Sequence, residues 1–320
     1  MALRLGLARR VRRSFDRGVH RLAWVGYGLV PAASPRRRRI ELVRNVQYRP
    51  TGRRSHMLDV YKPRGEGPHP AVLYVHGGAF SMLSKDTHRI MAFAIASQGY
   101  TVFNINYRLA PTNRYPTQLE DAAAALVWLM DHAREYGADP SRIVLAGESA
   151  GCNLVTALAW CATQRRPEPF ARAVFEREPG LRGVLAIYGL LDMHDIGRFW
   201  RNKAHMPRWL RSEITAAAQA YVGSPLDDRA RSATLASPLR LIEGPSDPDA
   251  RPLPPFFVAC GTADPLLDDS RRLAKALDAR GVPNVLSVHP GEIHGFNAMI
   301  WRREARAKWR AVHRFLKENA

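Results

Sequence analysis

The chain has 320 residues, of which 46% are hydrophobic, and this is enough to build packed cores in one large α/β domain or two small ones. Its three cysteines (Cys152, Cys161 and Cys260) are widely spaced in apolar surroundings. This argues against a disulfide framework or a metal cluster and favours a reduced compartment. The formal net charge is +19, and most of it lies near the N-terminus.

Residues 1–54 hold 15 arginines against two acidic residues, which gives them +13 of the total charge. Within them, residues 1–40 combine leucines and arginines at helical spacing, an apolar stretch over 22–33 and four arginines at 36–39. The apolar stretch has about 12 residues, fewer than the roughly 20 that a transmembrane helix needs. We therefore expect a helix that lies on an anionic membrane surface or covers the rest of the chain, in a cytoplasmic protein.

Two other interpretations of residues 1–40 remain open. Residues 12–15 (RRSF), followed by a cleavage-like AAS at 32–34, are similar to a twin-arginine export signal. However, Asp16 stands where such signals carry a hydrophobic residue, and arginines follow the cleavage-like site. A nucleic-acid-binding arm would account for the charge, but the segment has neither a recognition motif nor an aromatic stacking platform, so nucleic acid is not an expected partner.

From residue 41 onward, strand-like and helix-like patterns alternate. The first two strands are expected to form a hairpin around a Thr51-Gly52 turn, and a capping box from Thr117 to Glu120 is expected to begin a long Ala-rich helix. Such alternation predicts a mostly parallel sheet with helices on both faces. The expected strands are 41–49, 56–62, 71–75, 101–106, 142–146, 181–188, 256–260 and 284–289, and the expected helices are 87–97, 117–136, 152–160 and 297–316.

The alternation breaks between residues 189 and 255. This stretch is rich in Arg, Trp, Pro and Ala, with a helical pattern near residues 212–221. We interpret it as an insertion that lies over the carboxyl ends of the strands.

The most informative stretch is the sequence GESAG at residues 147–151. It follows a buried strand and precedes a helical pattern, so Ser149 is expected on a sharp strand-to-helix turn. Small residues two positions before and after the serine let such a turn close and hold the hydroxyl clear of the sheet. The next helix points its free N–H groups and positive dipole end at the same place, where an oxyanion would form. The pattern is therefore typical of a nucleophile elbow.

Three further motifs place polar groups at the ends of predicted strands. Residues 76–78 (HGG) follow the third strand, and their two glycines let backbone N–H groups approach a ligand closely. Asp264 follows the seventh strand, and His294 lies in a loop after the eighth. The chain order Ser, Asp, His is that of a catalytic triad on a sheet of this kind.

Five motifs in this order resemble the hormone-sensitive-lipase-like family of esterases, which has the α/β-hydrolase fold. They are residues 76–80 (HGGAF), 107–111 (YRLAP), 147–151 (GESAG), 261–268 (GTADPLLD) and 294–296 (HGF), and the resemblance covers about residues 41–315. It implies a mostly parallel, eight-stranded sheet with helices on both faces and a helical cap. The chain would then divide into an N-terminal helical segment (1–40), a catalytic core (41–188 and 256–320) and a cap insertion (189–255).

The chemistry of these motifs assigns roles to three side chains. Ser149 is expected to be the nucleophile, with His294 as its general base and later the general acid. Asp264 is expected to fix the imidazole tautomer and to stabilise the imidazolium. Asp268 and Asp269 are rival acids, but they fall in the first turn of the next helix and are expected to interact with its dipole.

The oxyanion hole is expected to consist of backbone N–H groups, those of Gly77, Gly78 and Ala150. Ala79 stands where the family usually has a third glycine, and this is expected to alter how the backbone of the loop lies. We interpret Glu148, beside the serine, as structural.

These features together predict a serine hydrolase that cleaves carboxylic esters, with short acyl chains, through an acyl-enzyme intermediate. No metal or cofactor is expected, and the expected partner is a small-molecule ester. An amide hydrolase of the formylkynurenine type or an acyltransferase would use the same triad. A catalytically inactive receptor on this fold is a further alternative, and the intact Ser149, Asp264 and His294 argue against it.

Overall fold

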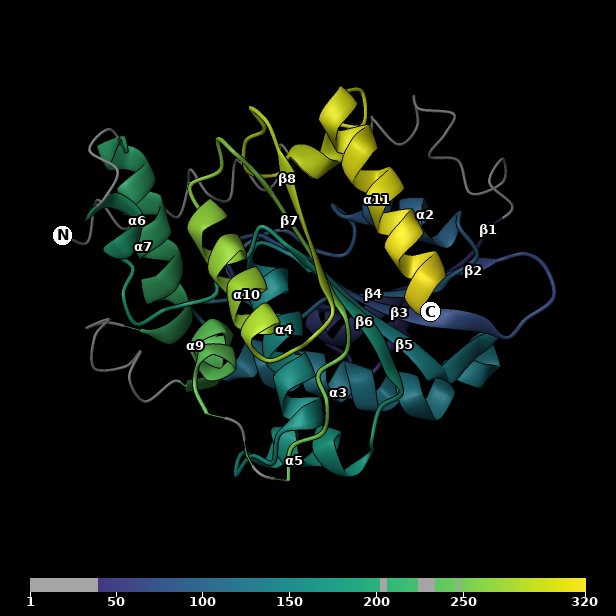
Figure 1. The fold of residues 1–320 in the computed structure, drawn as a ribbon. Helices are drawn as coiled ribbons and strands as arrows, with labels where there is room; N and C mark the ends of the chain where they lie inside the picture. Colours follow the sequence, from purple (N-terminus) through teal and green to yellow (C-terminus); the bar gives the residue numbers. More distant parts are fainter. Residues whose placement is uncertain (1–39, 202–205, 224–233, 246, 248) are drawn as a thin grey trace.

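The computed structural model of the protein describes residues 40–201, 206–223, 234–245, 247 and 249–320 (Figure 1). The predictions for the N-terminal segment, which include the membrane-surface helix and the export signal, lie outside these residues. In the part of the chain that is described, no helix is long and apolar enough to cross a membrane.

The described residues form one sheet of eight strands, which are β1 (Ile40–Gln47), β2 (Met57–Pro63), β3 (His69–Val75), β4 (Thr101–Ile105), β5 (Ala138–Glu148), β6 (Leu181–Ile187), β7 (Phe256–Gly261) and β8 (Asn284–His289). Their order is β1-β2-β4-β3-β5-β6-β7-β8. β2 runs antiparallel to β1 and β4, and the other neighbouring pairs are parallel. The structure therefore confirms the predicted mostly parallel sheet and the hairpin that begins it.

Helices cover both faces of this sheet (Figure 1). One face carries α2 (Arg89–Ala96) and α11 (Arg303–Asn319), and the other carries α3 (Thr117–His132), α4 (Ala150–Thr163) and α10 (Leu267–Ala279). Side chains alternate between the two cores along each strand, so that Leu73 of β3 joins the α3 and α4 side whereas Tyr74 joins the other. Both faces of the central strands are buried, which explains their nearly continuous apolar sequences.

Thr117 does not cap the helix that it was predicted to begin. α3 includes Thr117 as its first residue, and its N-cap position is Pro116, with no capping hydrogen bond from a side chain. The backbone N–H of Glu120 donates to the carbonyl of Pro116 at 2.9 Å, and the Glu120 carboxylate pairs with Arg108 at 3.3 Å. The predicted helix is confirmed, but the capping box is wrong because the helix starts one residue before the box requires.

The last helix begins at Arg303, not at Asn297 as predicted. The residues before it form a short 3₁₀ helix, Phe296–Ala298, and then a turn. Two contacts hold this bend. The indole N–H of Trp309 donates to the carbonyl of Asn297 at 3.0 Å, and the Arg302 guanidinium donates to the Glu292 carboxylate at 2.9 Å. Helical spacing in the sequence does not contain such long-range contacts.

The predicted cap insertion, residues 189–255, contains two kinds of structure. The expected helical piece is confirmed as α7 (Arg208–Val222), which follows the short α6 (Arg198–Arg201); both lie outside the helices that cover the sheet (Figure 1). α9 (Pro238–Glu243), which the sequence did not predict, packs instead against α4 and α10 of the core.

Candidate active site

Ser149 lies at the carboxyl end of β5, where the strand passes into α4. Its backbone takes φ 53° and ψ −116°, a region that residues other than glycine rarely occupy. A Cβ on Gly151 would lie 2.0 Å from the carbonyl oxygen of Val75, and one on Gly147 would lie 2.4 Å from that of Gly151. A side chain at either glycine would collide with backbone, so this sharp turn depends on both of them.

The structure brings the three predicted side chains into one hydrogen-bonded chain. His294 Nε2 lies 2.9 Å from Ser149 Oγ, and His294 Nδ1 lies 2.8 Å from Asp264 Oδ2. Asp264 is buried, and its other carboxylate oxygen accepts the N–H of Leu266 at 2.8 Å, which orients Oδ2 toward the imidazole. The side chain of His294 is 39% exposed, so water and a substrate can reach it. Distances of this kind allow a hydroxyl, an imidazole and a carboxylate to share hydrogen bonds, as the predicted roles require.

The electrostatic surroundings of His294 favour its protonated form. Burial lowers the pKa of the imidazole, but the charge of Asp264, the hydrogen bond to it and the charge of Glu148 together outweigh burial and raise the pKa above its ordinary value. A raised pKa means that this imidazole accepts a proton more readily than an ordinary histidine does.

Short backbone contacts hold the turn that carries Asp264 against the loop that carries His294. A Cβ on Gly261, the last residue of β7, would lie 2.0 Å from the carbonyl oxygen of Glu292. The N–H of Ala263 donates to the same carbonyl at 3.0 Å. Because β7 and β8 are parallel neighbours, their carboxyl ends meet at one edge of the sheet, and these contacts fix the acid relative to the base.

The two rival acids lie in the first turn of α10, as expected. Asp269 is fully buried, and its carboxylate accepts the N–H of Leu191 at 2.8 Å and pairs with Arg198 at 2.6 Å. It therefore ties the start of the cap insertion to the core, a role beyond the expected interaction with the helix dipole. Sequence reasoning missed this tie because Leu191 is 78 residues away.

The predicted oxyanion N–H groups of Gly77, Gly78 and Ala150 have no hydrogen-bond partner among the described residues. Gly77 packs directly against the elbow, since a Cβ there would lie 3.3 Å from Ser149 Cβ. Gly78 has φ 115°, and a Cβ there would lie 2.2 Å from the carbonyl oxygen of Met82. The oxyanion role of these three N–H groups stays a prediction.

The oxyanion loop, residues 77–83, continues with non-glycine residues in the left-handed region: Ala79 at φ 49°, Phe80 at 59° and Leu83 at 69°. The buried ring of Phe80 stacks on Tyr221 of α7, with ring centroids 3.8 Å apart and planes 3° from parallel. The cap helix thus holds the loop in place. Sequence reasoning missed this contact, because nothing in the helical pattern of α7 indicates which residue its tyrosine meets.

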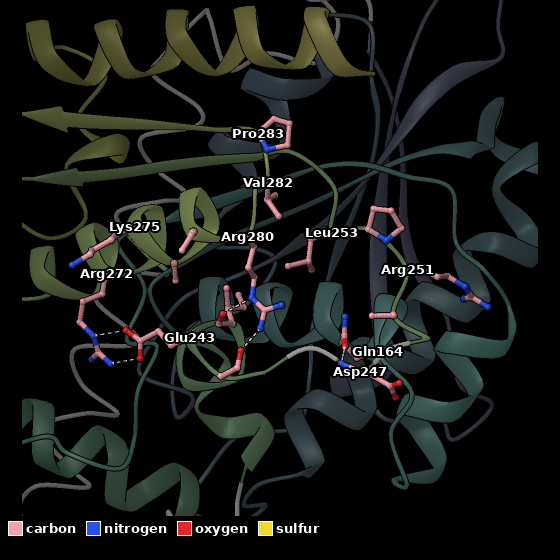
Figure 2. A pocket seen from close by; sticks show the side chains of 17 residues that line it. Gln164, Glu243, Asp247, Arg251, Leu253, Arg272, Lys275, Arg280, Val282 and Pro283 are labelled. Carbon is pink, nitrogen blue, oxygen red and sulfur yellow. Dashed lines mark hydrogen bonds and ion pairs between the residues drawn. The ribbon is translucent and has the colours of Figure 1, made fainter.

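A cavity of about 900 Å³ lies apart from these residues, beside α9 and α10, and none of the predicted site residues lines it (Figure 2). Its arginines are engaged within the protein. Arg272 pairs with Glu243 at 2.7 Å, and Arg280 donates to the carbonyl oxygens of Leu241 and Gly244 at the end of α9. The charge of Arg272 is therefore balanced by a carboxylate, and the guanidinium of Arg280 caps the end of α9.

α/β hydrolases carry a serine, an aspartate and a histidine, in this chain order, at the carboxyl ends of parallel strands. The comparison with known families agrees, because residues 72–298 match the profile of a family described as having the alpha/beta hydrolase fold. The chain therefore belongs to this α/β-hydrolase family, and the predicted likeness to the hormone-sensitive-lipase-like esterases is confirmed.

The relatives that the chain matches are named as esterases. It is 34% identical over 232 residues to carboxylesterase NlhH of Mycobacterium tuberculosis, and this match covers 71% of this chain and 66% of that protein. It is 32% identical over 235 residues to the acetyl esterase of Salmonella enteritidis, and this match covers 70% of this chain and 64% of that protein. The match thus spans slightly less than two thirds of these relatives. Among solved structures, a hyperthermophilic esterase from the archaeon Pyrobaculum calidifontis has a TM-score of 0.73 and 26% identity, covering 97% of this chain and 90% of that one.

Proposed function

We propose that this protein is a carboxylesterase that hydrolyses small esters of short-chain acids through an acyl-enzyme. The observation that carries the proposal is the hydrogen-bonded chain from Ser149 through His294 to Asp264. The names of the relatives support an ester as the substrate, and one of them is an acetyl esterase. They give no support to the amide hydrolase or acyltransferase alternatives.

Acylation begins when Ser149 Oγ bonds to the carbonyl carbon of the ester while its proton passes to His294 Nε2. The carbonyl oxygen becomes an oxyanion, which accepts hydrogen bonds from the N–H groups of Gly77, Gly78 and Ala150. When the tetrahedral intermediate collapses, the C–O bond to the alcohol breaks, and the imidazolium gives its proton to the leaving oxygen. The acyl group remains on the serine as an ester.

Deacylation repeats these steps with water in place of the serine. His294 takes a proton from the water as its oxygen bonds to the acyl carbon, and the same N–H groups hold the second oxyanion. The intermediate releases the carboxylic acid, and the proton returns from the imidazolium to Ser149 Oγ. Throughout, Asp264 accepts the hydrogen bond from Nδ1 and keeps Nε2 facing the serine.

The test is hydrolysis of p-nitrophenyl esters with acyl chains from acetyl to palmitoyl, together with labelling by a fluorophosphonate. Acetyl to hexanoyl esters are expected to react faster than dodecanoyl or longer ones. Ser149→Ala should lower the rate by about 10⁴- to 10⁶-fold and abolish labelling, with an unchanged circular dichroism spectrum. Full labelling of this variant would show that another residue is the nucleophile, and a catalytic efficiency that rises steadily to palmitoyl would indicate a lipase.

We also propose that the N-terminal segment (1–40) attaches the protein to anionic membranes, as a peripheral protein on the cytoplasmic side. The +13 charge of residues 1–54 supports this proposal, since each Arg near a charged leaflet contributes about 1 kcal/mol. Vesicles with anionic lipid should sediment the protein at low salt but much less at high salt, and deletion of residues 1–40 should abolish binding. Equal sedimentation with neutral vesicles would reject an electrostatic attachment. Recovery of a form shortened by about 33 residues from the periplasm would favour the export signal.

A further inference from the structure

Glu148, the residue before the nucleophile, is a carboxylate buried behind the elbow. Its side chain is only 7% exposed. Removing an ionised carboxylate from water to this degree is costly unless charged or polar partners satisfy its oxygens. The identity of those partners therefore decides what this side chain does.

Donors from three separate segments converge on this carboxylate. His88 Nε2, just before α2, lies 2.6 Å from Oε1, and Tyr188 Oη, just after β6, lies 2.5 Å from Oε2. Asn297 Nδ2, in the 3₁₀ helix after the histidine loop, lies 2.6 Å from Oε2. Burial alone would raise the pKa of Glu148, but these partners, with His88 the strongest, lower it to about 2. The carboxylate is thus a fixed negative charge across the neutral pH range.

Two of these donors also belong to the surroundings of His294. Asn297 follows it by three residues, and the ring of Tyr188 meets the imidazole edge-on, with ring centroids 4.8 Å apart. Tyr188 Oη also contacts Asn297 Oδ1, and the carbonyl of Asn297 is held by the indole N–H of Trp309. The carboxylate of Glu148 therefore connects the nucleophile elbow with the loop that presents the base.

We propose that Glu148 is a positioning residue of this site, which ties the elbow to the His294 loop and places a fixed negative charge behind the imidazole. This proposal rests on the function proposed above, in which His294 is the base. It goes beyond the structural role that the sequence suggested, because the charge itself favours the imidazolium that forms in each step.

Other titratable groups surround the pair formed by Glu148 and His294, and a change at Glu148 acts on them too. Lys308 is buried, and burial lowers its pKa to about 7 while the charge of Glu148 opposes the shift. The titratable groups around Glu148 and His294 are His88 beside α2, Tyr107 after β4, Tyr188 after β6, Asp264 after β7 and Lys308 of α11. For this reason the test pairs a variant that removes the charge with one that retains it.

The kinetic test compares Glu148→Gln, which keeps the length and loses the charge, with Glu148→Asp, which keeps the charge. Glu148→Gln should lower kcat by about 10- to 100-fold with little change in KM, since displacement of a base by about 1 Å has this effect. The acid limb of the pH profile of kcat/KM should move to lower pH, because the imidazolium loses a stabilising charge. Glu148→Asp should keep the limb near its wild-type position and recover much of kcat.

Two additional variants separate positioning from folding. Tyr188→Phe removes one donor while keeping the ring beside His294, and it should lower kcat less than Glu148→Gln. Asp121→Asn removes a buried carboxylate whose ion pairs, with Arg49 and Arg108, lie outside this network, so it should lower thermal stability but leave the acid limb in place. An unmoved limb in Glu148→Gln, or a limb that moves equally in Asp121→Asn, would overturn the proposal.

NMR titration of the His294 ring provides a measurement that needs no turnover. Its pKa should be lower in Glu148→Gln than in wild type and Glu148→Asp. Equal values would overturn the positioning role even if esters are hydrolysed. A lower value in a protein that hydrolyses no ester would keep the positioning role and reject the esterase. If Glu148→Gln does not fold, Tyr188→Phe decides, and wild-type kcat and His294 titration in that variant would overturn the proposal.

Discussion

The two halves of the candidate site are held in place by different means. In the half with Ser149 and Asp264, residues close in the sequence form each turn, namely the flanking glycines of the elbow and Leu266, two residues after Asp264, although Gly151 also lies against Val75 of β3. The oxyanion loop instead contains three non-glycine residues at positive φ, and one of them, Phe80, stacks on Tyr221 of α7. The sequence around Ser149 and Asp264 therefore contains the residues that form their turns, whereas the loop at residues 77–83 depends on how a distant helix packs.

The largest effect on turnover is expected from a substitution in the half of the site that contains Ser149 and Asp264. Asp264→Asn should lower turnover by about 10⁴-fold with substrate binding retained, because the amide holds the imidazole in the wrong tautomer. Steady-state kinetics with a short acyl ester would measure both quantities. Asp268→Asn, four residues further along the chain, is the matched control and should have far less effect. Similar losses in the two variants would leave the acid unassigned.

A smaller effect on kcat is expected from a substitution that weakens the packing of α7 against the loop at residues 77–83. Tyr221→Leu removes the ring that stacks on Phe80, an interaction of about 0.5–1.5 kcal/mol beyond burial. We expect kcat to fall by roughly 10-fold, as the loop donors lose their fixed positions, with the larger part of the loss in kcat and not in KM.

Tyr221→Phe is the control for this variant. It keeps the ring, and the hydroxyl it removes is buried with no hydrogen-bond partner among the described residues. Tyr221→Phe should therefore retain wild-type kcat and at least wild-type stability. A wild-type kcat in Tyr221→Leu as well would mean that the loop holds its own shape, and the two halves of the site would then be alike.

The same contrast explains which features could be predicted from the sequence. Ser149 and Asp264 lie after the strands that the sequence predicted, β5 and β7, because glycine spacing and strand ends are local signals. The stack of Phe80 on Tyr221 and the three donors around Glu148 join residues that are far apart in the chain, so no periodic pattern contains them.

Helix boundaries failed for a similar reason. The capping box at Thr117 was a correct local pattern, but Pro116 takes the cap position in the folded chain. The 3₁₀ helix and turn before Arg303 depend on contacts with Trp309 and Glu292. The helix α5 (Pro169–Glu176) was not predicted at all, although it is as long as α2, which was.

The smallest effect is expected at Ala79, the position where the family usually has glycine. Its φ of 49° costs an alanine on the order of 1 kcal/mol, and glycine would relieve that strain but lose more backbone entropy on folding. Because these two effects nearly cancel, Ala79→Gly should change the free energy of unfolding by less than about 1 kcal/mol in urea titrations and leave kcat within roughly threefold of wild type. The change is small because Phe80, the next residue, remains stacked on Tyr221 and keeps the loop in position. A loss of tenfold or more would place the Ala79 methyl group against the substrate, and the loop would then act in specificity as well as in oxyanion binding.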